Sequence, residues 1–141
     1  MISTLVAVSD IEEFRTLTHR YALLLDTATA EGIEHVFTQD AVFDASAIDL
    51  PVLTGLDAIR GFWNAIFGLT VHTAHVATNH IFTPGDTATG THYLRAEMIY
   101  KDGSTTLITV LNTDTYHRTD DGWRIAHRVV KPLLPLVRTE A

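Results

Sequence analysis

A histidine-bearing segment, Thr73–Phe82, is the part of this 141-residue chain best suited to chemistry. Its β-branched, small and aromatic residues alternate with polar ones, and nothing in it favours a helix, so it is expected to be a strand. Side chains two apart on a strand share a face, so His75, Asn79 and Ile81 are expected to point the same way. An imidazole and an amide among small and apolar side chains predict the wall of a small-molecule pocket.

His75 is the residue that we expect to move a proton. An imidazole titrates near pH 6.5 and can take or give a proton at neutral pH. A carboxylate that accepts its second N–H would fix the tautomer and make the free nitrogen more basic. A phenol nearby would donate to an oxygen that gains negative charge. Such a set suits abstraction of a C–H next to a carbonyl, then loss of water or double-bond migration, with no metal or organic cofactor.

The chain has eight histidines, which raises the alternative of a metal site. His72, His75 and His80 do not repeat a metal-ligand spacing, and the last two are expected on opposite faces of the strand. No Asp or Glu stands beside them on the strand. We therefore expect no metal site.

Length and composition restrict the class of protein. The chain is expected to fold as a single domain, residues 1–141, with a sizeable core. A net charge of −7 argues against a nucleic-acid partner, and no segment approaches the ~20 apolar residues of a membrane span. There is no basic amphipathic stretch for a membrane surface, and the apolar start, Met1–Val8, lacks the basic residues of a signal peptide. The absence of cysteine fits a cytoplasmic protein.

Helical spacing of apolar residues predicts three helices in the first half of the chain. A capping box that begins at Ser9 marks the start of the first helix, expected at about 10–29. A short second helix is expected at Glu31–Phe37. A third is expected at Gly55–Phe67, ended by Gly68.

After Val71 the period of the hydrophobic pattern changes to two. The expected strands, after a short one at 41–45, are Thr73–Phe82, Ala88–Tyr100, Thr105–His117 and Trp123–Val130. Hairpin turns join them, the first at Pro84–Asp86. Helices followed by an antiparallel meander predict an α+β fold. Long twisted hairpins with helices on one face predict a curved sheet that closes as a cone around a ligand site.

The chain resembles the SnoaL-like branch of the nuclear transport factor 2-like superfamily over about residues 10–130. The resemblance rests on the order and spacing of loose motifs: Arg20-Tyr21-Ala22 with Leu25-Asp26, Phe37–Asp44, Gly55 with Asp57-Ala58-Ile59, His75 with Asn79, and Gly122–Ile125. It implies a cone-shaped α+β fold with three N-terminal helices on a mainly antiparallel sheet, a deep apolar pocket, and a dimer or trimer formed through the sheet. The superfamily includes both enzymes and non-catalytic subunits, so the fold alone does not assign a function.

Among these relatives the residue pattern is most similar to that of scytalone and bile-acid dehydratases. The resemblance carries the helix Tyr and Asp to Tyr21 and Asp26, and the strand His to His75. Asn112 matches a further Asn, which could be a second donor to the substrate. A second acid or base expected on the following strand is missing, because Met98 stands there.

Two other members of the superfamily match the chain less well. The general base of a ketosteroid isomerase would fall at Ala45, beside Asp44 but on the opposite strand face. Limonene epoxide hydrolase implies an Arg between two Asp on neighbouring strands. Arg95 and Glu97 match half of that pattern, but Arg128 stands where the facing Asp would be.

From these observations we expect a cofactor-independent lyase or isomerase that acts on a small apolar hydroxy-ketone such as a steroid or polyketide. His75 is the expected base, Asp26 orients it and Tyr21 is the donor. The residues expected to contact the substrate are Phe43, Asp44, Trp63, Asn79, Met98 and Asn112. Two alternatives remain: a non-catalytic binding or assembly subunit, favoured by Met98, and an epoxide hydrolase that activates water with Asp44 or Glu97.

Overall fold

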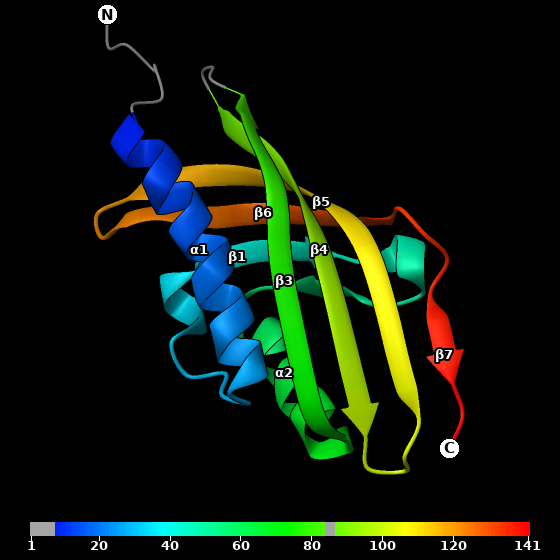
Figure 1. The fold of residues 1–141 in the computed structure, drawn as a ribbon. Helices are drawn as coiled ribbons and strands as arrows, with labels where there is room; N and C mark the ends of the chain where they lie inside the picture. Colours follow the sequence, from blue (N-terminus) through cyan, green and yellow to red (C-terminus); the bar gives the residue numbers. More distant parts are fainter. Residues whose placement is uncertain (1–7, 84–86) are drawn as a thin grey trace, which may run out of the picture.

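The computed structural model describes residues 8–83 and 87–141, and Figure 1 shows their arrangement. The expected turn at Pro84–Asp86 and the residues before Val8 lie outside the described part. The elements, in chain order, are α1 (Val8–Asp26), the 3₁₀ turn η1 (Ile33–His35), β1 (Phe37–Asp44), the 3₁₀ turn η2 (Ser46–Ile48), β2 (Val52–Thr54), α2 (Leu56–Leu69), β3 (Thr70–Thr83), β4 (Ala88–Tyr100), β5 (Thr105–Thr119), β6 (Gly122–Pro132) and β7 (Val137–Thr139).

The strands form one curved sheet in the order β2-β1-β6-β5-β4-β3. The short strand β7 pairs with the first residues of β5, Thr105–Leu107. All neighbours are antiparallel except β1 and β6, which run parallel. In Figure 1, β6 and β1 run across the view, whereas β3 and β4 run down it, so the sheet is strongly curved. β2 and β3 remain as the two edges of the sheet, so among the described strands the sheet does not close into the expected full cone.

The core lies between the sheet and the helices. On α1 the buried residues recur at helical spacing, as the sequence predicts, and include Phe14, Leu17, Tyr21 and Leu25. They pack against aromatic and aliphatic side chains of the sheet in one continuous apolar cluster. The mainly antiparallel α+β architecture is therefore confirmed.

The expectation of three helices is wrong, because the described residues contain two α-helices. The segment predicted as a second helix holds only the single turn Ile33–His35. Gly32 before it has a φ of +89°, which a helix does not continue, and Phe37 already begins β1. Too few residues remain between these two points for a helix to propagate.

The long strand β3 contains a bulge that the alternation pattern conceals. Its register against β4 shifts between Thr78 and Ile81, and Asn79 there has a left-handed φ of +58°. One extra residue reverses the phase of the strand. His75 is therefore buried, whereas Asn79 and Ile81 are exposed, and the expected shared face is wrong beyond residue 78.

Candidate active site

His75 and Asp26 meet where the end of α1 crosses β3. Asp26 is the last residue of α1, and its Oδ1 lies 2.7 Å from His75 Nδ1. Its Oδ2 accepts the backbone N–H of His75 at 3.0 Å, and its Oδ1 accepts the Thr73 hydroxyl at 3.2 Å. A carboxylate at a helix C-terminus is disfavoured by the helix dipole, so these bonds to β3 hold it in place.

The carboxylate fixes the tautomer of the neutral imidazole. A carboxylate only accepts, so Nδ1 of His75 carries the proton and Nε2 keeps its lone pair. The His75 side chain is 2% exposed and that of Asp26 is 27% exposed. Burial lowers the pKa of His75 below its ordinary value, and hydrogen bonding and charge from Asp26 act in the opposite direction. The ring is therefore neutral and able to accept a proton at pH 7.

His75 opens onto an apolar cavity of about 130 Å³ between α2 and the sheet. Of the residues expected to contact a substrate, Phe43, Trp63, Met98 and Asn112 line this cavity together with His75. Most of the remaining lining is aliphatic or aromatic and comes from α2, β4, β5, β6 and the segment around η2. Such a cavity suits an apolar ligand with few polar groups.

Tyr21 lies beside His75, with 6.4 Å between the ring centres, but it is not among the residues that line the cavity. Burial raises the pKa of its phenol above the ordinary value, and the positive charge of the Arg128 guanidinium beside it opposes that rise. Five positions separate Tyr21 and Asp26, which is about 140° on a helix. Asp26 therefore reaches β3 while Tyr21 points into the core, and the expected donor role of Tyr21 toward a substrate stays a prediction.

Asp44 and Asn79 also lie away from the cavity. Asp44 accepts the backbone N–H and the hydroxyl of Ser46, at 3.1 and 2.6 Å, and these bonds lower the pKa of its carboxyl. Asn79 is exposed in the β3 bulge. Glu97 is exposed on the opposite face of the sheet. No carboxylate from these positions is placed to activate water in the cavity, so the geometry does not favour the epoxide-hydrolase alternative.

A buried polar network lies beside the cavity, and of its members the sequence indicated only Asn112 as a site residue. Asn112 Nδ2 lies 3.1 Å from His92 Nε2, and His92 Nδ1 lies 3.6 Å from Asp114 Oδ2. Arg128 pairs with Asp114 through two hydrogen bonds of 2.7 and 2.9 Å and also donates to Thr18 at 3.1 Å. Burial and the Arg128 charge lower the pKa of His92 to about 3, so its ring is neutral.

The alternating pattern of β4 indicates two further residues on the cavity side that were not among the predicted site residues. On β4 the side chains at even positions face the cavity side, so His92 and Tyr100 share the face of Met98. Tyr100 and Thr106 both line the cavity, and their hydroxyls lie 3.4 Å apart. No sequence pattern indicated that Asp114 pairs with Arg128, because that contact depends on the β5–β6 register.

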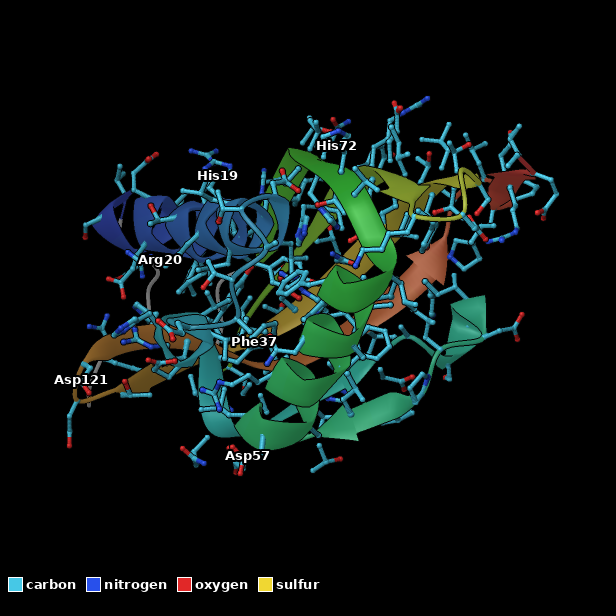
Figure 2. All side chains as sticks on the ribbon, turned by 90° about the horizontal axis from the view of Figure 1, so that it is seen from below. His19, Arg20, Phe37, Asp57, His72 and Asp121 are labelled. Atoms are coloured by element: carbon cyan, nitrogen blue, oxygen red, sulfur yellow. The ribbon has the colours of Figure 1, made fainter. Side chains whose placement is uncertain are left out.

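The histidines do not gather into a metal site. In Figure 2, His19 and His72 lie at the periphery of the molecule, whereas Phe37 lies in its interior. Within residues 8–83 and 87–141, no group of three His, Asp or Glu residues could hold a metal ion. No helix in the same part of the chain is long and apolar enough to cross a membrane.

Sequence and structure comparisons identify relatives of the chain. A profile of the SnoaL-like domain matches residues 6–129, and no curated protein matches the chain. A proposed aromatic ring hydroxylase from Novosphingobium aromaticivorans is 32% identical, covers 94% of this chain and 95% of its own, and has a TM-score of 0.89.

Two more distant structures share the fold alone. A proposed scytalone dehydratase from the same organism is 18% identical, with coverage of 95% and 89% and a TM-score of 0.82. A hexachlorocyclohexane dehydrochlorinase is 14% identical, with coverage of 95% and 91% and a TM-score of 0.83. The fold is that of the nuclear transport factor 2-like superfamily.

Proposed function

This chain belongs to the SnoaL-like domain family, and we propose that it is a cofactor-independent lyase that removes water from a small apolar hydroxy-ketone. The observation that carries the proposal is the 2.7 Å contact between His75 and Asp26 at the wall of an apolar cavity. A buried, oriented imidazole with a free lone pair is a general base. Fold neighbours described as a dehydratase and a dehydrochlorinase carry names of elimination chemistry, which agrees with this assignment.

One imidazole suffices for the proposed reaction. His75 Nε2 takes the proton from the carbon next to the carbonyl, and the electron pair of that C–H bond forms an enolate. The enolate re-forms the carbonyl, a C=C bond forms, and the C–O bond to the hydroxyl at the β-carbon breaks. The imidazolium returns its proton to the leaving hydroxyl as water. These reaction steps need no second acid, so Met98 at the second acid/base position does not prevent the reaction.

The size of the cavity favours a single-ring substrate. An apolar cavity of about 150 Å³ holds a benzene molecule, and this one has about 130 Å³. A fused-ring steroid exceeds that volume. We therefore propose a β-hydroxy-ketone built on one ring, which agrees with the apolar lining.

A panel of single-ring β-hydroxy-ketones tests this function, with wild type and His75→Ala assayed for the enone product by its ultraviolet absorption. We expect conversion by wild type and a loss of about 10²–10⁴-fold in His75→Ala. His72→Ala is the matched control, because His72 is an exposed histidine of the same strand and does not line the cavity. Equal rates in wild type and His75→Ala would contradict the proposal.

The second candidate function is a non-catalytic subunit that only binds a small apolar molecule. Met98 in the cavity wall, where the resemblance implies a proton-transfer group, favours it. It predicts that His75→Ala binds the same ketones as wild type and that neither protein converts them. Calorimetric binding on the panel separates the two functions.

A further inference from the structure

We infer that the cavity binds the two oxygens of a hydroxy-ketone at opposite kinds of polar group: the ketone oxygen at the indole N–H of Trp63, and the hydroxyl group at the side-chain oxygen of Asn112. Trp63 belongs to α2 and Asn112 to β5, so the two groups belong to different layers of the fold. The inference deepens the proposed function, whose cavity it shares, and its test does not depend on turnover.

Two of the residues that line the cavity carry a buried polar atom without a hydrogen-bond partner among the described residues. In the described part of the chain, five buried side-chain nitrogen or oxygen atoms have no hydrogen-bond partner. Only two of the five belong to residues that line the cavity, and they are Trp63 Nε1 and Asn112 Oδ1. Buried polar groups are nearly always paired, so two unpaired groups at one apolar cavity point to a ligand that pairs with both.

Trp63 supplies the donor. An indole nitrogen can only donate, so its partner must be an acceptor such as a ketone oxygen. Trp63 is 8% exposed, and its ring centre lies 6.3 Å from that of His75 at nearly right angles. A ketone held there has its α-carbon near the base. The N–H also stabilises the negative charge that develops on the ketone oxygen when His75 removes the proton.

Asn112 supplies the acceptor, because His92 fixes which way its amide points. His92 Nδ1 faces the Asp114 carboxylate at 3.6 Å, and Asp114 accepts two hydrogen bonds from Arg128. A proton on Nδ1 is favoured there, since a lone pair would face the carboxylate. The neutral ring then accepts at Nε2, so the Asn112 group 3.1 Å away is the donating NH₂.

The side-chain oxygen of Asn112 is therefore the atom without a hydrogen-bond partner in the part of the chain that the structure describes. Asn112 is 1% exposed and lies in the cavity wall. This assignment reverses the donor role expected from the sequence. A ketone oxygen placed against it would set two acceptors face to face, whereas a hydroxyl satisfies it. His92 and Asp114 are positioning residues: they do not line the cavity, and they act by fixing the direction of the Asn112 amide.

Two pairs of one-ring ligands without a leaving group test the two contacts separately. Cyclohexanone and methylenecyclohexane differ in the acceptor, and cyclohexanol and methylcyclohexane differ in the donor. Calorimetry on wild type should show about tenfold tighter binding of the oxygen-bearing member of each pair. Trp63→Phe should remove the preference for cyclohexanone only, and Asn112→Leu the preference for cyclohexanol only. Failure of cyclohexanone or cyclohexanol to bind, equal binding within a pair, or preferences that survive the variants would overturn the inference.

Nuclear magnetic resonance of wild type provides a second test that does not require a variant to fold. Cyclohexanone should shift the Trp63 indole N–H resonance, and methylenecyclohexane should not. Trp123 is the internal control, because its Nε1 already donates to Asp10 at 3.0 Å. The nitrogen spectrum of His92 should show the proton on Nδ1. A proton on Nε2 would place the Asn112 oxygen against His92 and overturn the assignment of the acceptor. Because none of these measurements uses turnover, they can succeed even if His75 proves not to be catalytic.

Discussion

At the scale of the residue, the pKa of His75 decides the pH range in which the chain can remove a proton. Burial lowers that pKa below 6.5, and Asp26 partly opposes the shift. Only the neutral ring accepts a proton, so kcat/KM should rise as pH increases through the lowered pKa and remain level above pH 6.5. A pH–rate profile between about pH 4 and 8 measures this. An apparent pKa above 6.5 for the rising limb would contradict the assignment.

Removal of the Asp26 charge tests the orienting role. In Asp26→Asn the amide can hold the wrong tautomer of His75, so kcat should fall by about 10²–10⁴-fold. The carboxylate also raises the pKa of His75, so the rising limb of the pH–rate profile should move to lower pH in the variant. Asp57→Asn is the control, because the Asp57 side chain is fully exposed on α2. An unchanged rate in Asp26→Asn would show that His75 does not need this partner.

The sequence predicted the individual groups of the site better than their directions. His75 and Asp26 meet as expected, because residue types and spacing are visible in the sequence. The direction of the Asn112 amide depends on a chain of contacts through His92 to Asp114, and no single segment contains that chain. The displacement of Tyr21 toward Arg128 likewise depends on a strand more than a hundred residues away.

At the scale of the element, the end of α1 determines where Asp26 lies. The N–H of Thr29 bonds to the carbonyl of Leu24 and that of Ala28 to the carbonyl of Leu25, at 3.0 and 3.1 Å, which is a Schellman motif. Its left-handed position holds Ala28, with a φ of +52°, where glycine is usual. This turn stops the helix directly after Asp26 and so keeps the carboxylate at β3.

We predict that Ala28→Gly stabilises the protein by about 0.5–1 kcal/mol, because glycine removes the left-handed strain and the site is exposed. Ala65→Gly in the exposed interior of α2 should instead destabilise it by about 1 kcal/mol. Urea unfolding of both variants measures the difference. The same sign for the two substitutions would argue against strain at residue 28.

The two-residue period of the hydrophobic pattern predicted that strands β3 to β6 exist. It did not predict, for every residue, which face of the sheet the side chain occupies. Alternation is the same on both sides of a bulge, so the inserted residue at Asn79 leaves no local mark in the pattern. The short segment Glu31–Phe37 shows the complementary error. Its composition allows a helix, but the pairing of Phe37 with Ile125 on β6 removes the residues that a helix would need.

At the scale of the whole molecule, the outer face of the sheet exposes apolar side chains, among them Val76 at 56% and Tyr93 at 41%. We propose that this face forms the dimer or trimer that the family resemblance implies. Sedimentation velocity should show an oligomer for wild type and a monomer for Val76→Lys, because a buried unpaired ammonium is costly. Val52→Lys is the matched control, since Val52 is similarly exposed, at 51%, on the opposite edge strand. A monomeric wild type would rule out this interface.

Proton exchange at the α-carbon of a ketone tests most directly whether His75 is the base. Wild type incubated in heavy water with a saturated single-ring ketone should replace the α-hydrogens with deuterium faster than buffer does. His75 removes the α-proton, the imidazolium exchanges that proton with heavy water, and His75 returns a deuteron to the enolate carbon without any leaving group. The same exchange should fall to the buffer rate in His75→Gln and should persist in His72→Ala. Exchange at the wild-type rate in His75→Gln, or no exchange above buffer in wild type, would contradict the assignment of His75 as the base.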